Sequence, residues 1–169
     1  VTMVARSNWF GGVYRDPKNF FAQFAVSDNY LDLYPEFIVP PTQRADYERD
    51  RRGALIGRQL ADQYGFKIGD VIPIKGTIYP GTWDFVVRGI MEGRDESTIT
   101  RQMVFHWDYL NETVRKKTAR QADQVGVYVI GVDNPDNAAA ISRTVDNVFK
   151  NSLAETLTET EQAFQLGFV

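Results

Sequence analysis

The side chains with the clearest chemical capacity in this sequence are its one histidine and the carboxylates that could assist it. His106 lies in the segment VFHWDY, two residues before Asp108. An imidazole beside a carboxylate can act as a general base, so one hypothesis is a small hydrolase that uses His106 with Asp108 or Asp95. A lone histidine next to a tryptophan on a strand is more typical of a hydrogen-bonded structural residue. We therefore predict no catalytic residue in this chain.

Metal and nucleotide chemistry have no support among the motifs. The chain has one histidine and no cysteine, which excludes a histidine-rich or thiolate metal site within it, and Asp95 and Glu96 lack a recognisable ligand spacing. The phosphate-binding patterns G-x-x-x-x-G-K-[ST] and G-x-G-x-x-G are absent, as is the nucleophile elbow G-x-S-x-G. We expect no metal ion and no cofactor.

Asp70 and a group of basic side chains have a functional and a structural interpretation. Asp70 follows Gly69, and an aspartate in that place commonly fixes a turn by bonding to nearby backbone amides. The basic residues share their predicted helix with Asp108 and Glu112 and lack an aromatic stacking platform, which indicates a solvated face rather than a nucleic-acid site. The basic residues on this helix are Arg115, Lys116, Lys117 and Arg120, and Arg101 lies upstream of it.

Seven aromatic side chains could partly line a groove, although the protein core is the more common place for such residues. A groove of this kind would suit a free-standing module that binds a small molecule or a peptide. We keep that module as the alternative hypothesis from a different functional class. The seven residues are Trp9, Phe10, Tyr14, Tyr79, Trp83, Trp107 and Tyr109.

Composition describes an ordinary globular domain. The 169 residues are 43% hydrophobic and 24% charged, and this length is sufficient for a sizeable core. The 19 basic and 22 acidic residues give a net charge of -3, so the chain has no overall attraction for nucleic acid or an anionic membrane. No run of about 18 apolar residues is present.

The stretch from Gly53 to Gly93 predicts a helix, a tight turn and two strands. The helix should end at a left-handed Gly65, and Gly69-Asp70 should form the turn. Strands are expected over residues 71–74 and 85–91. The expected apolar face of the helix consists of four residues at helical spacing: Ile56, Leu60, Ala61 and Tyr64.

Strands and helices alternate through the rest of the chain. Strands are expected over residues 2–9, 20–26, 103–107 and 125–132, and helices over 28–34 and 108–120. The charged segment 40–52 is expected to be a solvated loop or an exposed helical turn. A further helix should follow the capping sequence Asp133-Asn134-Pro135. Its apolar stripe consists of Ile141, Val145, Val148 and Phe149.

This alternation favours an α+β fold with a ferredoxin-like β-α-β-β-α-β core and an inserted smaller lobe. We expect one domain over residues 1–169, with a core lobe over about 1–75 and 121–162 and the inserted lobe over about 76–120. The chain begins at Val1 without a methionine and ends within an apolar pattern, which we interpret as the sign of a segment from a longer protein.

A motif within the Gly53–Gly93 stretch resembles a known family. It comprises Gly57 to Ala61 with Gly65, then Lys67-Ile68-Gly69-Asp70, and then the strand Val86 to Gly89 that leads into Ile90. These residues resemble the periplasmic core domain of MacB-type ABC-transporter permeases, a group that includes FtsX-like and LolC/LolE-like subunits. In that family, a helix with Leu-Ala near its middle leads to Gly-Asp and then to a strand that ends in valine-x-glycine.

The resemblance implies a non-enzymatic, extracytoplasmic domain of a bacterial permease in the inner (cytoplasmic) membrane, facing the periplasm. Its implied role is mechanotransmission, in which ATP-driven movement of membrane helices is coupled to substrate export or partner activation. The opening strand and residues 156–161 would act as stalks with both ends on the membrane side. Residues 163–169 are expected to begin a transmembrane helix, and the alternative is a terminal strand or helix packed on the core.

The implied partners follow from the same resemblance. They are the membrane helices of the permease itself and a separate ATP-binding subunit or segment. A second permease copy and a periplasmic or outer-membrane protein are further candidates. No nucleic acid is expected. The transported substrate is not specified by any motif in the sequence.

Overall fold

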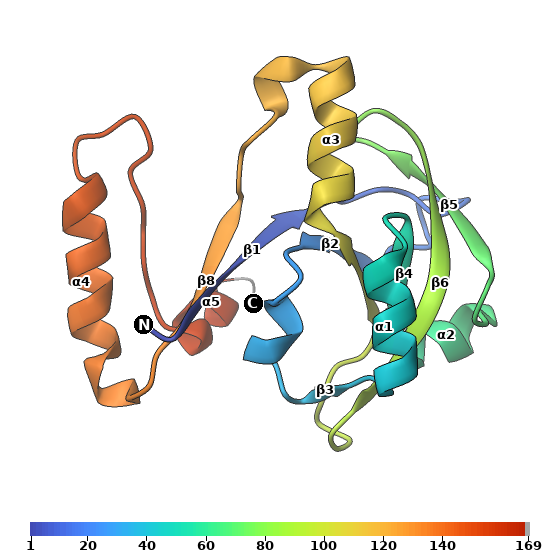
Figure 1. Ribbon diagram of the computed structural model, residues 1–169, viewed down its shortest axis with the longest axis horizontal. Helices are drawn as coiled ribbons and strands as arrows, with labels where there is room; N and C mark the ends of the chain where they lie inside the picture. The colour runs from blue at the N-terminus through green and yellow to red at the C-terminus, as the bar shows by residue number, and fades with distance from the viewer. Residues whose placement is uncertain (168–169) are drawn as a thin grey trace. The chain divides into compact units, whose positions relative to one another are not determined.

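The computed structural model describes residues 1–167, and the chain divides into two compact units (Figure 1). Residues 4–129 form the larger unit. Residues 1–3 and 130–167 form the smaller unit. The chain therefore enters the larger unit at its fourth residue and leaves it near residue 129.

Eight strands in the described part of the chain form one mixed sheet. The strand order is β3-β6-β4-β7-β2-β1-β8, and β5 pairs with β6. The pairs β2–β7 and β4–β6 are parallel, whereas β1–β2, β4–β7, β5–β6 and β3–β6 are antiparallel. The bounds are β1 Met3–Trp9, β2 Ala22–Val26, β3 Phe37–Ile38, β4 Gly53–Gly57, β5 Val71–Gly76, β6 Gly81–Gly93, β7 Gln102–His106 and β8 Val127–Gly131.

Helical segments connect these strands. The larger unit contains η1 Tyr30–Leu33, α1 Pro41–Arg49, α2 Arg58–Tyr64, α3 Trp107–Lys117 and η2 Ala119–Gln121. The smaller unit contains η3 Pro135–Asn137, α4 Ala138–Phe149 and α5 Glu161–Leu166. The charged segment 40–52 contains the complete helix α1, which begins at a proline because the first helical position has no hydrogen bond to lose.

The helix expected from Ile56 to Tyr64 begins later than predicted. Residues 53–57 form the strand β4, and all five are buried. This strand lies between β6 and β7, and its side chains pack into apolar clusters on both faces of the sheet, so the apolar-polar alternation of a half-exposed strand is missing. A short continuous apolar run fits a buried strand and a helix equally well. Ile56 therefore belongs to the strand, and only Leu60, Ala61 and Tyr64 belong to α2.

The turn signals after this helix are confirmed. Gly65 ends α2 in the left-handed conformation, with φ of 71°. The Lys67 amide donates to the Asp70 carboxylate at 2.9 Å, and the Asp70 amide donates to the Lys67 carbonyl at 3.0 Å. Strand β5 then alternates exposed and buried residues, with Ile72 and Ile74 facing the core. Asp70 thus has the predicted role of a turn residue.

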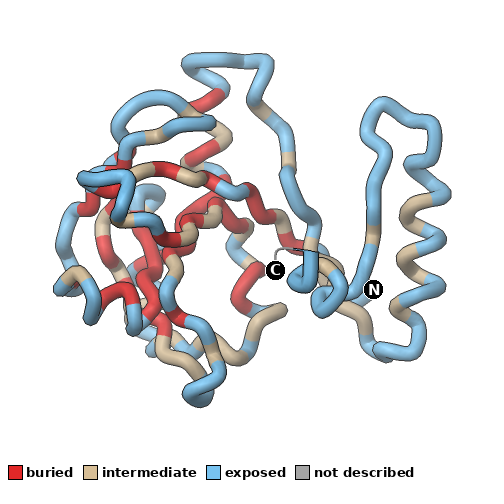
Figure 2. Tube along the Cα trace, turned by 180° about the vertical axis from the view of Figure 1, so that it is seen from behind, coloured by how far each residue is buried: buried red, intermediate tan, exposed pale blue. Residues whose placement is uncertain are grey.

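The core of the larger unit consists of two apolar clusters on opposite faces of the sheet. Neighbouring residues of a strand point to opposite faces, so Leu55 belongs to one cluster and Ile56 to the other. The first cluster is rich in aromatic residues and contains Leu60 of α2 and Leu110 of α3. The second contains Tyr47 of α1. Figure 2 shows the buried residues of this unit along the strands.

The α+β class is confirmed, but the ferredoxin-like arrangement with an inserted lobe is not. Residues 76–120 supply β6, β7 and α3, and these pair with β4 or pack in the same core. They share one compact unit with residues 4–75. The two compact units therefore have different bounds from the expected lobes.

The smaller unit contains the predicted cap and helix after β8. The Asn134 side chain accepts a hydrogen bond from the Asp136 amide at 3.0 Å, which starts η3 and then α4. The Asp146 carboxylate of α4 accepts hydrogen bonds from the hydroxyls of Thr156 and Thr158 at 2.8 and 2.7 Å. These bonds hold residues 156–158 against α4. No residue in 130–167 is fully buried, and the stripe residue Val148 is 70% exposed.

Within residues 1–167, no helix has the length and apolar character needed to cross a membrane. Helix α5 has six residues and is capped by the Thr160 hydroxyl, which accepts a hydrogen bond from the Ala163 amide at 3.2 Å. The transmembrane helix expected to begin at 163–169 extends into residues 168–169, which lie outside the described residues. That expectation stays a prediction.

Candidate functional site

His106 ends β7 and lies almost entirely inside the protein. Its Nε2–H donates to the backbone carbonyl of Tyr47 at 2.8 Å, and its Nδ1 lies 3.2 Å from the Asp28 carboxylate. The imidazole stacks on the Tyr47 ring with the ring centres 4.0 Å apart. These contacts join β7 to α1 and to the turn before η1. Contacts of this kind are typical of a structural histidine, and only 6% of the surface of His106 is exposed to solvent.

The partners of His106 differ from those of the hydrolase hypothesis. Asp28 and Tyr47 contact the ring, whereas Asp108 is exposed in the first turn of α3. Asp95 lies in an exposed turn where it accepts hydrogen bonds from Ser97. Burial raises the pKa of the Tyr47 hydroxyl, so this phenol stays protonated beside the imidazole. Sequence spacing therefore did not identify the actual contacts of His106.

Asp95 and Glu96 line a hollow of about 330 Å³ at the start of α2. Its walls also include Arg58 and Glu92, which form an ion pair at 2.6 Å. Across residues 1–167, no group of three or more histidine, cysteine, aspartate or glutamate side chains could hold a metal ion. Within the described structure, the hollow is therefore a charged surface in which Arg58 and Glu92 neutralise each other.

The basic side chains near α3 mostly have local partners. Arg115 forms an ion pair with Asp123, and Lys117 lies over the Trp83 ring with its ammonium 5.9 Å from the ring centre. Arg101 donates to the side chain of Gln63 at 2.8 Å. Pairing with acids, amides and a ring fits the interpretation of a solvated face.

The seven candidate groove aromatics are distributed between core and surface. Four are buried, namely Phe10, Tyr14, Trp83 and Trp107, while Tyr79 and Tyr109 are partly buried against the same cluster. Trp9 is 42% exposed and packs against Phe20 and Phe24 with ring-centre distances of 5.9 and 5.4 Å. Most of these rings therefore stabilise the core of the larger unit rather than line an open groove.

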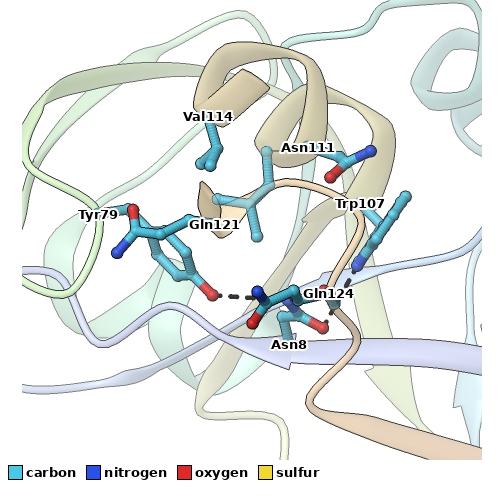
Figure 3. A pocket seen from close by; sticks show the side chains of 8 residues that line it. Asn8, Tyr79, Trp107, Asn111, Val114, Gln121 and Gln124 are labelled. Atoms are coloured by element: carbon cyan, nitrogen blue, oxygen red, sulfur yellow. Dashed lines mark hydrogen bonds between the residues drawn. The ribbon is translucent and has the colours of Figure 1, made fainter. Parts of the chain in front are cut away.

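Tyr79 and Trp107 do meet at a small polar cavity of about 10 Å³ (Figure 3). This volume has room for roughly one water molecule, which is too little for a metabolite or a peptide. Asn8 lies at the cavity and bonds to Tyr79 and Trp107. The sequence gives one weak signal for Asn8, a polar residue inside a predicted strand. Side chains of α3, η2 and the segment before β8 complete the lining: Leu110, Asn111, Val114, Gln121 and Gln124.

Comparison with protein families matches residues 1–148 to the model of the MacB-like periplasmic core domain. A search of curated proteins finds no match to the sequence.

Three solved structures share the fold at low sequence identity. The extracellular domain of the noncanonic ABC-type transporter YknZ from Gram-positive bacteria has a TM-score of 0.62 and 11% identity, covering 94% of this chain and 79% of that one. The periplasmic region of MacB from Actinobacillus actinomycetemcomitans has a TM-score of 0.55 and 9% identity, covering 99% and 76%. A domain of a permease protein from Porphyromonas gingivalis has a TM-score of 0.51 and 14% identity, covering 98% and 68%.

Proposed function

Because the chain belongs to the family of MacB-like periplasmic core domains of ABC-transporter permeases, we propose that it transmits movement rather than catalyses a reaction. In this proposal, ATP hydrolysis in a separate subunit or segment moves the membrane helices of the permease. The domain carries that movement to substrate export or to activation of a partner outside the membrane. A second permease copy and a periplasmic or outer-membrane protein are the partners that we propose for it.

One observation supports the mechanical role most directly. Both connections of the larger unit run through the sheet, on the adjacent strands β1 and β8. The outer ends of these strands belong to the smaller unit together with residues 1–2 and 132–167, and there the Thr2 amide donates to the Gly131 carbonyl at 2.8 Å. A domain that is attached at both of its chain ends can transmit displacement when the two attached segments belong to the same structural unit. Thr2 and Gln162 lie in the one unit, as that arrangement requires.

The chemistry of the described residues supports a role without catalysis. His106 contacts the Tyr47 backbone carbonyl and the Asp28 carboxylate, and the cavity beside Asn8 has room for roughly one water molecule. We propose that no side chain of this domain acts as an acid, a base or a nucleophile. The domain would instead act through its rigidity and its attachment.

A flexible insertion tests the mechanical role. About ten Gly/Ser residues placed after Gly167 leave the capped helix α5 intact but add a flexible linker after it. A flexible linker should transmit little force or orientation between the domain and the membrane helices. We expect the permease to keep its ATPase activity and expression level and to lose its output. Output is measured as rescue of the phenotype of a strain that lacks the permease.

The matched control places the same insertion after Glu96, in an exposed loop of the larger unit. This variant should keep normal output, because the loop lies outside both connections. Normal output with the insertion after Gly167 would contradict mechanical coupling. It would favour the binding module, which needs only to be tethered nearby.

A further inference from the structure

Asn8 is a buried amide that contacts both connections of the larger unit. It lies on β1, near the entry of the chain, and is 6% exposed. Its Oδ1 accepts hydrogen bonds from the Gly126 backbone amide at 2.8 Å and from the Trp107 indole at 3.3 Å. Its Nδ2 donates to the Gln124 carbonyl at 3.0 Å and to the Tyr79 hydroxyl at 3.5 Å. The amide therefore uses its two donors and both lone pairs of its acceptor.

These partners come from separate parts of the larger unit. Gln124 and Gly126 belong to the segment that leads into β8, the exit strand, while Trp107 begins α3 (Figure 3). One side chain on the entry strand thus holds the exit segment and the main helix together. We call this set of contacts, centred on Asn8, the Asn8 clasp.

A second anchor holds the exit segment to α3 from the surface. Asp123 has a left-handed backbone with φ of 61°, and its amide donates to the Asn111 side chain at 2.7 Å. Asn111 in turn donates to the Asp123 carboxylate at 3.1 Å, and Arg115 pairs with the same carboxylate. The exit segment is therefore fixed at residues 123, 124 and 126 before β8 begins.

The clasp is stiff on its buried side, where Asn8 meets Trp107, while its partners Gln124 and Gly126 are exposed residues. In a low-dielectric environment hydrogen bonds are strong, and a group that loses its partner there is not compensated by water. Sliding the exit segment past β1 would leave the buried amide group of Asn8 unsatisfied, whereas the Gly126 amide lies in an exposed segment where water can replace its partner. The two connections must then move as one body as long as the clasp is intact.

We propose that Asn8 is a positioning residue that locks the entry strand to the exit segment, so that displacement arriving along either connection moves α3 and the sheet as one rigid body. This inference rests on the proposed mechanical function. It assigns the coupling to a single side chain within the larger unit.

Hydrogen exchange of the whole chain tests the lock itself. The substitution Asn8→Leu keeps the approximate size of the side chain but removes both the oxygen that accepts from the Gly126 amide and the nitrogen that donates to the Gln124 carbonyl. Exchange of the Gly126 amide should accelerate at least about tenfold, while the amides of β4 keep their rates. If Asn8→Leu does not fold, Asn8→Ser shortens the side chain but keeps it polar and is measured in the same way. Equal acceleration in β4 and at Gly126, or none, would overturn the lock.

The control variant is Asn111→Ala. It releases Asp123 from the neighbouring anchor but leaves the four contacts of Asn8 in place. Exchange should accelerate at Asp123 and stay slow at Gly126. Fast exchange at Gly126 in this control would show that the surface anchor, and not Asn8, holds the exit segment.

A reversible crosslink tests the role in coupling. The chain has no cysteine, and a Cβ added at Gly126 would lie 3.7 Å from the Asn8 Cα, close enough for a disulfide between Asn8→Cys and Gly126→Cys. In the full permease we expect the reduced double variant to hydrolyse ATP without output and the oxidised one to recover output. Because a disulfide also stabilises the fold, the melting temperature of the reduced and oxidised forms is measured alongside output, and a reduced variant that is as stable as the parent but lacks output supports the role in coupling. Recovery of output that only follows recovery of stability would overturn that role.

The two sets of variants separate the inference from the proposed function. If the linker after Gly167 abolishes output but the reduced and oxidised crosslink variants give the same output, the clasp is not the coupling element and the mechanical function stands. If the linker leaves output normal as well, the mechanical function itself is wrong.

Discussion

Replacement of Gly57 by alanine should destabilise the larger unit through one close backbone approach. Gly57 ends β4 and precedes α2, with φ of -64° and ψ of 147°. Any residue can adopt these angles, so glycine is not needed here for its conformational freedom. A Cβ at this position would lie 1.5 Å from the Thr100 carbonyl oxygen. The absence of a side chain at Gly57 is therefore a requirement of packing.

The expected loss of stability follows from the displacement of the Thr100 backbone and from the hydrogen bonds that Thr100 would lose. To reach ordinary contact with the new methyl, its backbone must retreat by roughly 2 Å. The Thr100 amide donates to the Gln59 side chain at 3.0 Å, and the Gln59 amide donates to the Thr100 hydroxyl at 3.1 Å. Overpacking costs about 1–3 kcal/mol, and each lost hydrogen bond costs about 1 kcal/mol. We expect Gly57→Ala to lower the free energy of unfolding by about 3–5 kcal/mol.

Urea and thermal unfolding followed by tryptophan fluorescence measure this loss, since Trp83 and Trp107 are buried in the larger unit. The expected fall in melting temperature is on the order of 10 °C. The matched control is Gly65→Ala, where φ is 71° and no atom lies within 4 Å of the added Cβ. Backbone strain alone should cost this control about 1 kcal/mol. A loss at Gly57 no larger than that at Gly65 would refute the packing argument.

Three further predictions concern single side chains. Leu60→Ala should lower the free energy of unfolding by about 2–5 kcal/mol, because Leu60 is fully buried in α2; a change near zero by urea titration would show that this face is not packed. His106→Gln should cost about 1–2 kcal/mol through lost contacts to Asp28 and Tyr47 while ATPase rate and output stay unchanged; lost output in a folded variant would support a catalytic role. Hydrogen bonds from Thr158 and Thr156 hold the pKa of the Asp146 carboxyl below its ordinary value of 3.8. The attachment of residues 156–158 to α4 should therefore be complete above pH 3.8. It should be lost as the pH falls through the lowered pKa of Asp146, because the protonated carboxyl no longer carries the charge that strengthens these bonds. Exchange of the Thr158 amide followed by NMR measures this, and an Asp146→Asn variant whose exchange shows the same pH dependence would contradict it.

Local features of the sequence predicted the elements that depend on local physics. The alternation in β5 places Ile72 and Ile74 toward the core, and Gly65 and Gly69 have the positive φ angles expected of a helix end and a turn. The motif from Gly57 to Ile90 indicated the family that the comparison then identified over residues 1–148. These features can be recognised in the sequence because each depends on residue types and their spacing along one continuous stretch of the chain.

The strand β4 shows where local signals fail. Its five residues form one buried apolar run, and only the pairing of β6 and β7 on its two sides decides that the run is a strand. The bounds of the compact units differ from those of the lobe expected at 76–120 for a related reason. The sequence of β6 does not indicate that this strand pairs with both β4 and β5, because strand pairing depends on the arrangement of the whole sheet.

The sequence by itself determined the α+β class, the turns, the caps and the absence of cysteine and of nucleotide-binding motifs, because each depends on residue type and short-range spacing. Only the tertiary structure decided what the polar side chains contact. Asn8 meets Gly126 across 118 residues, and His106 meets Asp28 across 78. Contacts of this range arise when the sheet brings distant strands together and removes water from between them, so that buried polar groups bond to whichever partners the fold supplies.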